Sequence, residues 1–124
     1  PLTEVLVPID QTVGVPTTAT CAEAEAVSRD TGRSRLVVRE GDTPTGIAHV
    51  RDIVRAAAQA PVTTVTTPVL HVDQGLSLLD TVSLMRNGHA QLVIVDGPSG
   101  PVGLVTMEDL LERVLGTFED ETDT

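Results

Sequence analysis

An internal repeat constrains the fold of this chain more than any other feature of its sequence. Residues 32–38 (GRSRLVV) match residues 88–94 (GHAQLVI) at an offset of 56 positions. Residues 46–54 (GIAHVRDIV) match residues 103–111 (GLVTMEDLL) at an offset of 57 positions. Because self-similarity at a fixed distance is typical of a duplicated structural unit, we interpret the chain as a tandem duplication.

The boundaries of the two repeats follow from this match. We place the change of offset by one residue in two polar turns, at residues 40–45 and 96–101, because insertions in surface turns disturb a fold least. We therefore expect a first repeat at residues 1–60 and a second at residues 61–118. An acidic tail at residues 119–124 is most simply a disordered terminus.

Each repeat carries the signals of a helix, two strands and a second helix. The patterns Thr20–Glu23 and Ser77–Asp80 are typical of capping boxes at helix starts, and Gly32 and Gly88 are typical of helix ends. Apolar spacing predicts which side chains of these two helices face the core: Ala22, Ala26 and Val27 in the first, Leu78, Val82 and Met85 in the second.

The strands are predicted from short apolar runs between turns. Residues 36–38 and 92–95 are continuous apolar runs, which indicates strands buried on both faces. The other expected elements are strands near residues 45–49 and 102–106, helices at 51–59 and 108–115, a leading strand before each half at 5–8 and 65–68, and a linker at 60–64. One half of about 55 residues would bury little surface alone. We therefore predict an α+β fold in which two β-α-β-β-α repeats pack sheet to sheet about a pseudo-twofold axis, with a ligand cleft between them.

Composition excludes several classes of function. The chain has 18 acidic residues against 8 Lys and Arg residues, and its net charge of −10 disfavours binding to nucleic acids or anionic membranes. Phe118 is the only aromatic residue, which excludes the common base-stacking platforms. The single cysteine, Cys21, suits a reducing compartment and has no zinc-ligand spacing to the histidines. The sequence has no nucleophile with a base, no Walker-type loop and no paired catalytic carboxylates, so we expect no enzymatic activity.

Three stretches of the sequence resemble a known family. They are residues 5–8 (VLVP), residues 32–38, and residues 103–112 (GLVTMEDLLE) with Gly116 and the acidic residues 119–123 that follow. Together they resemble a tandem pair of cystathionine-beta-synthase (CBS) domains. The pair is most similar to that of the CorC/HlyC and cyclin M (CNNM) family of membrane proteins, which is linked to magnesium and cobalt transport.

This resemblance implies a regulatory domain of a longer chain. Such a domain would follow a membrane-embedded domain and lie on the cytoplasmic side of the cell membrane, with Pro1 and Thr124 as boundaries of an excised piece. CBS pairs of this family commonly bind ATP or another adenosine nucleotide, with or without Mg²⁺, and form disc-shaped homodimers. Ligand binding would change the dimer and pass that change to the membrane domain.

The main candidate ligand site begins at Thr106. A Thr hydroxyl and the Asp109 carboxylate, one helical turn apart at a helix start, can both face a ribose diol. The alternative is a capping box, in which both side chains only satisfy backbone N–H groups. Glu108 is a candidate to hold Mg²⁺ through water beside a phosphate, although an exposed first-turn Glu also simply favours a helix start.

The resemblance assigns the other contacts of this site to Val7 and to residues 33–35. Val7 stands where family members contact adenine, and Arg35 where they reach the phosphates. Arg33 replaces an aromatic residue of the family, so adenine would stack on a guanidinium plane, next to Ser34. The alternative is that Arg33 and Arg35 are two solvated side chains of a loop.

A second, weaker site is expected at the corresponding positions of the repeat, Thr67, Ala90, Gln91, His49 and Asp52. His49 takes the place of Thr106 there, so the hydroxyl is replaced by an imidazole that can still donate one hydrogen bond. Two other functions stay open: a ligand-free dimerisation and docking module, and the CBS pair of an unrelated parent protein. Which nucleotide binds, which ion is transported and how the dimer is oriented do not follow from the sequence.

Overall fold

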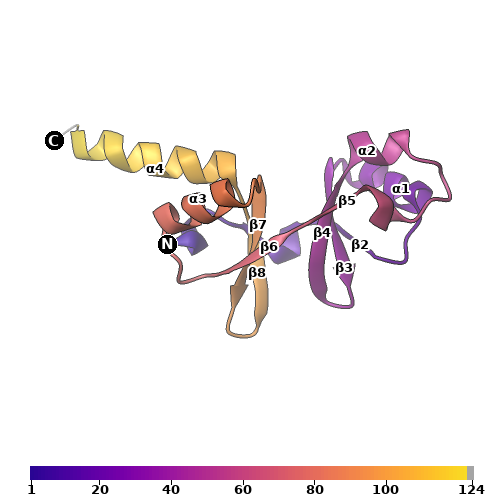
Figure 1. Ribbon diagram of the computed structural model, residues 1–124, viewed down its shortest axis with the longest axis horizontal. Helices are drawn as coiled ribbons and strands as arrows, with labels where there is room; N and C mark the ends of the chain where they lie inside the picture. Colours follow the sequence, from indigo (N-terminus) through magenta and orange to yellow (C-terminus); the bar gives the residue numbers. More distant parts are fainter. Residues whose placement is uncertain (123–124) are drawn as a thin grey trace. The chain divides into compact units, whose positions relative to one another are not determined.

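The chain folds into two compact units. The computed structural model describes the backbone of residues 1–122 and the side chains of residues 1–116, while Asp123 and Thr124 lie outside the described residues. Unit 1 combines Pro1–Ile9 with Leu70–Thr124, and unit 2 is the continuous stretch Asp10–Val69. Within the described residues, each unit contains one four-stranded sheet and two α-helices, which confirms the α+β class (Figure 1).

Unit 2 is built on a sheet with the strand order β2-β3-β4-β5. Its strands are β2 (Gly14–Pro16), β3 (Arg35–Glu40), β4 (Thr43–His49) and β5 (Thr66–Pro68). Strand β2 runs parallel to β3, and the other pairs are antiparallel. The helices α1 (Cys21–Thr31) and α2 (Val50–Arg55) lie together on one face of this sheet, and the short 3-10 helices are η2 (Ile9–Gln11) and η3 (Val62–Val65) (Figure 1).

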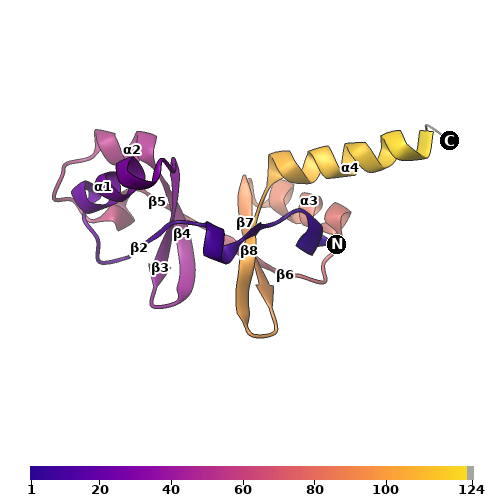
Figure 2. The same cartoon turned by 180° about the vertical axis from the view of Figure 1, so that it is seen from behind.

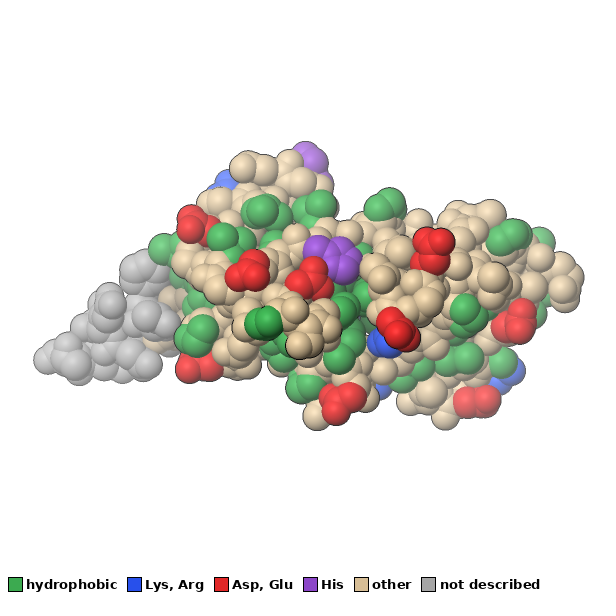
Figure 3. Space-filling model, turned by 90° about the horizontal axis from the view of Figure 1, so that it is seen from below, with side chains coloured by type: hydrophobic (Ala, Val, Ile, Leu, Met, Phe, Trp, Pro, Cys, Tyr) green, Lys and Arg blue, Asp and Glu red, His purple; other side chains and the backbone are tan. Residues whose placement is uncertain are grey.

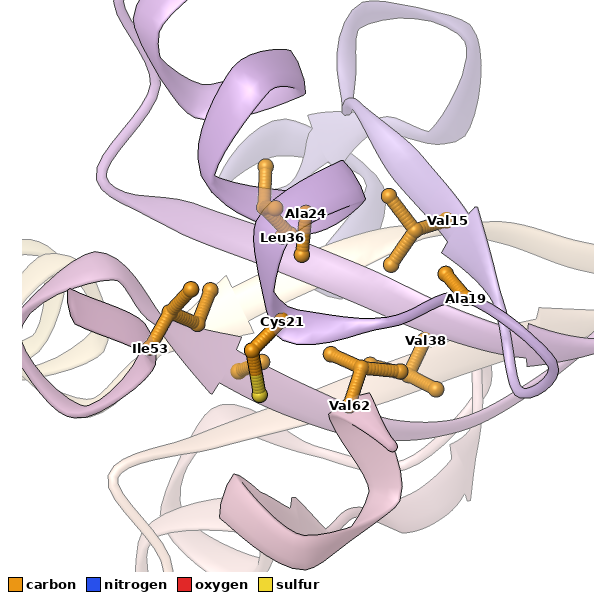
Figure 4. Close-up of a cluster of buried hydrophobic side chains, with 9 residues drawn as sticks. Val15, Ala19, Cys21, Ala24, Leu36, Val38, Ile53 and Val62 are labelled. Carbon is orange, nitrogen blue, oxygen red and sulfur yellow. The ribbon is translucent and has the colours of Figure 1, made fainter. Parts of the chain in front are cut away.

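The core of unit 2 lies between the sheet and its helices. Figure 4 shows Leu36 of β3 next to Ala24 of α1 and Val38 of β3 next to Val62 of η3, with Ile53 of α2 in the same cluster. Val62 is fully buried although it lies within the expected linker, residues 60–64. The segment between the repeats therefore contributes to the core.

Unit 1 has the strand order β1-β8-β7-β6. Its elements are η1 (Leu2–Glu4), β1 (Val7–Pro8), β6 (Leu70–Asp73), α3 (Leu78–Asn87), β7 (Leu92–Gly97), β8 (Gly100–Thr106) and α4 (Met107–Thr122) (Figure 2). The buried cluster includes Leu2, Met85, Val93, Val105 and Leu110. Leu2 therefore holds the start of the chain in the core of unit 1.

The two repeats correspond at a constant offset of 57 residues. Arg35 pairs with His49 in unit 2, and Leu92 pairs with Thr106 in unit 1. A register shift follows Val38 in one hairpin and Val95 in the other. The expected change of offset in the turns is therefore wrong, because both hairpins have the same length.

The wrong offset of 56 residues comes from the ends of the first helix in each repeat. Both predicted ends are confirmed, since α1 ends before Gly32 and α3 ends before Gly88. However, the residue in the left-handed conformation is Gly32 in the first repeat, at φ 73°, and His89 in the second, at φ 53°. Gly32 thus corresponds to His89, and matching it with the identical letter at Gly88 shifted the alignment by one residue.

The leading strands differ from the expectation. Strand β1 pairs with β8, in the sheet formed by the second repeat, and β5 pairs with β4, in the sheet formed by the first. Each leading strand therefore belongs to the other half, and the first strand of each half is instead β2 or β6, neither of which was predicted.

Helices α1 and α4 also depart from the expectation. The buried side of α1 carries Cys21, Ala24 and Ser28 rather than Ala22 and Ala26, while Val27 is partly buried. Helix α4 extends to Thr122, so the first residues of the expected acidic tail are helical.

Helix α2 ends at Arg55, earlier than expected, because the chain beyond it forms hydrogen bonds with the start of α1. The carbonyls of Ala58 and Ala60 accept hydrogen bonds from the backbone N–H groups of Ala22 and Cys21, both at 2.8 Å. These N–H groups belong to the first turn of α1 and have no partner within their own helix. No helix among the described residues is long and apolar enough to cross a membrane.

Candidate functional site

Six of the predicted site residues lie in unit 1, around the junction of β8 and α4. Thr106 is the last residue of β8, and its hydroxyl Oγ1 accepts a hydrogen bond from the backbone N–H of Asp109 at 3.2 Å. The backbone N–H of Met107 donates to the carbonyl of Gln91 at 2.8 Å. Val7 pairs with Leu104 on the neighbouring strand β1. The sheet register thus brings three distant segments to the start of α4.

The carboxylate of Asp109 sets this helix start apart from a closed capping box. In α1, Thr20 caps the N–H of Glu23, and the Glu23 carboxylate in turn accepts the N–H of Thr20 at 3.0 Å. At α4 only the bond to the Thr106 hydroxyl forms, and among the described residues the Asp109 carboxylate has no hydrogen-bond partner. Asp109 is half-buried. A half-buried carboxylate without a partner is available to accept hydrogen bonds from a ligand.

The other predicted residues of unit 1 differ in exposure. Glu108 and Gln91 are exposed, while Val7 is half-buried and Ala90 packs against the core cluster. In the described part of the chain, no three His, Cys, Asp or Glu side chains come together to hold a metal ion.

Arg33, Ser34 and Arg35 lie in unit 2, where their backbone is fixed and their side chains are exposed. The hydroxyl of the buried Ser28 donates to the carbonyl of Arg33 at 2.6 Å, and the carbonyl of Ser34 accepts the N–H of Val50 at 2.7 Å. Neither guanidinium forms an ion pair with a carboxylate of the described residues. Both arginines are thus available to an anion in solution.

His49 acts as the N-cap of α2. Its ring atom Nδ1 accepts a hydrogen bond from the backbone N–H of Arg51 at 3.0 Å. A ring nitrogen that accepts carries no proton, so the neutral ring has its N–H at Nε2. His49 therefore matches Thr106 in capping its helix and in keeping one donor for another partner.

An open pocket of about 460 Å³ lies in unit 2 between α2 and the segment that leads into β5. Two predicted residues, Asp52 and Thr67, line this pocket, whereas His49 does not. The remaining lining residues were not predicted: Arg55, Ala56, Thr64, Val65 and Thr66. The threonine-rich run at residues 63–67 could have indicated these pocket residues, but it was interpreted as part of the linker and the leading strand. The volume is within the range of small-molecule sites.

The predicted main site draws on both units, and so does the weaker one. Val7, Thr106, Glu108 and Asp109 belong to unit 1, and residues 33–35 to unit 2. Thr67, His49 and Asp52 belong to unit 2, and residues 90–91 to unit 1. At the constant offset of 57, Ala90 corresponds to Arg33 and Gln91 to Ser34, so the second repeat has no cation at these positions.

Charge is spread thinly over the face of the molecule shown in Figure 3. Carboxylate side chains occur there singly, and arginine side chains are few. The chain as a whole has a net charge of −10. A polyphosphate ligand would therefore need local cations, and Arg33, Arg35 and Arg55 are the arginines at the candidate sites.

Comparison with known proteins identifies two copies of one domain. The family model of the CBS domain matches residues 4–59 and 62–116. Among curated relatives, the UPF0053 protein MT1890 of Mycobacterium tuberculosis is 34% identical over 97% of this chain and 28% of its own length. "Possible hemolysin C" of Rickettsia akari is 28% identical over 97% of this chain and 42% of its own length. The chain thus spans less than half of these relatives.

Solved structures show the same fold. The CBS domain of the bacterial CNNM/CorC family Mg²⁺ transporter, in complex with ATP, matches with a TM-score of 0.83 and 24% identity. That match covers 94% of this chain and 87% of the other. A CBS-domain pair with bound AMP from Klebsiella pneumoniae matches with a TM-score of 0.76 and 19% identity, over 92% of this chain and 97% of the other.

Proposed function

The chain belongs to the CBS domain family, and we propose that it is a regulatory module that binds an adenosine nucleotide. The parent protein would be an ion transport protein of the CorC/CNNM type, acting on Mg²⁺ or Co²⁺. The hemolysin C and UPF0053 names of relatives and the fold of the CNNM/CorC domain support this assignment. The module would act on the cytoplasmic side of the membrane and would have no catalytic role.

The Asp109 carboxylate carries this proposal. It is half-buried at the start of α4, it has no partner among the described residues, and it stands one turn from the Thr106 hydroxyl. A carboxylate can accept hydrogen bonds from both hydroxyls of a ribose, and such charge-assisted bonds are stronger than neutral ones. Val7 on the adjacent strand is the proposed adenine contact, and Glu108 the proposed contact to Mg²⁺ carried by the phosphates.

Arg33, Ser34 and Arg35 remain in the ligand-binding role of the sequence argument, with Arg35 at the phosphates and Arg33, next to Ser34, stacked on adenine. Their exposed side chains and the absence of ion pairs to described carboxylates are consistent with this role. We propose the second nucleotide site at the pocket of unit 2, where Asp52 corresponds to Asp109 and Thr67 is on the leading strand, as Val7 is in unit 1. Nucleotide binding would favour one arrangement of a homodimer through its higher affinity for that arrangement, and so bias the membrane domain.

Calorimetric titration with ATP, ADP and AMP, each with and without Mg²⁺, tests the proposal on wild type and on Asp109→Asn. We expect Asp109→Asn to bind about 10- to 100-fold more weakly, because a hydrogen bond to a charged group contributes about 1.5–3 kcal/mol. Asp80→Asn is the matched control. Asp80 is exposed and holds the same helix position in α3, where its backbone N–H likewise donates to a capping hydroxyl, Oγ of Ser77, at 3.0 Å.

Three results would contradict parts of this proposal. If no nucleotide produces heat at millimolar concentration, the chain is not a nucleotide sensor, and a ligand-free docking module becomes the better description. If Asp109→Asn and Asp80→Asn both bind as wild type does, the module binds nucleotide elsewhere. A soluble catalytic domain in place of transmembrane segments in the parent chain would reject the transport assignment.

A further inference from the structure

Gly46, in the middle of β4, lies against the leading strand β5. A Cβ atom at this position would collide with the Thr66 side-chain methyl Cγ2 and would lie 2.7 Å from the carbonyl oxygen of Thr67. Real Cβ atoms essentially never approach other heavy atoms this closely. Strand β5 can therefore lie at its observed distance from β4 only because residue 46 has no side chain.

Neither neighbour of Gly46 can move away easily. The hydroxyl of Thr66 donates to the carbonyl of Val62 at 2.7 Å, which fixes the rotamer that directs the methyl group toward Gly46. Val62 is fully buried in the core of unit 2, so this acceptor is held in place. The Thr67 oxygen is part of the backbone of β5 and can shift only if the strand itself shifts.

The position of β5 decides the width of the unit 2 pocket. One wall of the pocket is formed by residues 64–67, and the other by Asp52 and Arg55 of α2 together with Ala56, which directly follows the helix. Both walls are attached to β4, since β5 pairs with it and α2 continues from it directly at Val50. A displacement of β5 from β4 would therefore move Thr67 relative to Asp52.

We propose that Gly46 is a positioning residue of the nucleotide site in unit 2, which it serves by docking β5 so that Thr67 and Asp52 face one pocket. This inference rests on the proposed nucleotide binding. The repeat supplies a second instance in unit 1, because Gly103 corresponds to Gly46 at the constant offset of 57. A Cβ at Gly103 would collide with the carbonyl of Val7 and lie 2.7 Å from Leu6 Cδ1.

The test compares Gly46→Ala with Gly103→Ala in the whole chain by site-resolved NMR titration with ATP. At 13.0 kDa the chain is small enough for amide signals to be followed individually. We expect Gly46→Ala to weaken the ATP affinity measured at the Asp52 and Thr67 amides by about tenfold or more. The reason is that an added methyl group in a packed site displaces the backbone around it. Gly103→Ala should leave these two amides unchanged and weaken the response at Asp109. Gly116→Ala is the control, since a Cβ there meets no described atom within 4 Å beyond the neighbouring turns of its own helix.

A rescue variant separates positioning from a general loss of stability. Gly46→Ala combined with Thr66→Ser removes the colliding methyl group and keeps the hydroxyl that bonds to Val62. We expect this double variant to regain part of the ATP affinity lost in Gly46→Ala. A double variant that binds no better than Gly46→Ala, or a Gly46→Ala variant that binds as wild type does, overturns the proposal.

Hydrogen exchange without ligand tests the docking of β5 independently of nucleotide binding. The N–H of Val69 donates to the carbonyl of Thr45 at 3.3 Å, across the junction of β4 and β5. We expect faster exchange of Val69 in Gly46→Ala and unchanged exchange in β3. If wild type shows no ATP response, the proposed function fails at this site, and the Val69 exchange alone decides the positioning: unchanged protection in Gly46→Ala refutes it.

Discussion

Leu2→Ala should destabilise unit 1 strongly although residue 2 is next to the start of the chain. The Leu2 side chain is 0% exposed and belongs to the buried cluster that contains Met85 and Leu110. The substitution removes three carbon atoms, which costs roughly 2.5 kcal/mol in lost transfer free energy at about 0.8 kcal/mol each. The cavity left behind adds to this, so we expect a total of about 3–5 kcal/mol.

Urea unfolding followed by far-ultraviolet circular dichroism measures this loss. The sequence has no Trp and no Tyr, so intrinsic fluorescence offers little signal. Leu79→Ala is the matched control, because Leu79 on α3 is 61% exposed and should cost at most about 0.5 kcal/mol.

The location of the effect is as informative as its size. Leu2 is absent from the core cluster of unit 2, so hydrogen exchange of the Leu36 and Val38 amides should be less affected than that of Val93 and Val105. If Leu2→Ala unfolds at the same urea concentration as Leu79→Ala, the start of the chain is frayed in solution and its burial in unit 1 is refuted.

Two further predictions concern the capping box of α1. Thr20→Ala should lower the free energy of unfolding by about 1 kcal/mol, because the N–H of Glu23 loses its acceptor; an unchanged thermal midpoint would contradict this. The N–H of Thr20, and then its hydroxyl, hold the pKa of Glu23 below its ordinary value of 4.5. The ionised carboxylate therefore stabilises the fold above pH 4.5, and this contribution is lost as the pH falls through the lower folded-state pKa. Glu23→Gln should accordingly be less stable than wild type at pH 7, and thermal melts should show the difference shrinking in acid; a difference independent of pH would refute the assignment.

Local signals in the sequence predicted the ends of α1 and α3 well. The capping box at Thr20 forms with both of its hydrogen bonds, and Ser77 caps α3. Such signals are reliable because every atom that takes part lies within four residues of the others. The buried strands at residues 36–38 and 92–95 are confirmed. This signal is also local, because a continuous apolar run is unfavourable in water and is stable mainly in a buried element.

Features that depend on distant partners could not be predicted in this way. The pairing of β1 with β8 joins residues about a hundred positions apart, and nothing within residues 5–8 specifies that partner. Strand β2 was not predicted because a strand of three residues that contains Gly and Pro has no apolar pattern. His89 adopts a left-handed conformation that favours glycine, so the identity of Gly32 and Gly88 pointed to the wrong match.

The candidate site was predicted in part. The spacing of Thr106 and Asp109 indicated that both would stand at a helix start, but only the structure distinguishes a closed capping box from a free carboxylate. The pocket residues Arg55 and Thr64 were missed. They come together because α2 stops at Arg55 and the chain turns back to cap α1, which is a tertiary effect.

The swapped leading strands have a consequence for the order in which the protein is made. Unit 2 is one uninterrupted stretch, Asp10–Val69, whereas unit 1 needs both the first nine residues and everything from Leu70 onward. During synthesis, all strands of unit 2 are translated before β8, the partner of β1. Unit 2 can therefore complete its sheet while residues 1–9 still lack theirs. Residues 1–9 are therefore translated before unit 2 but acquire their native contacts after it.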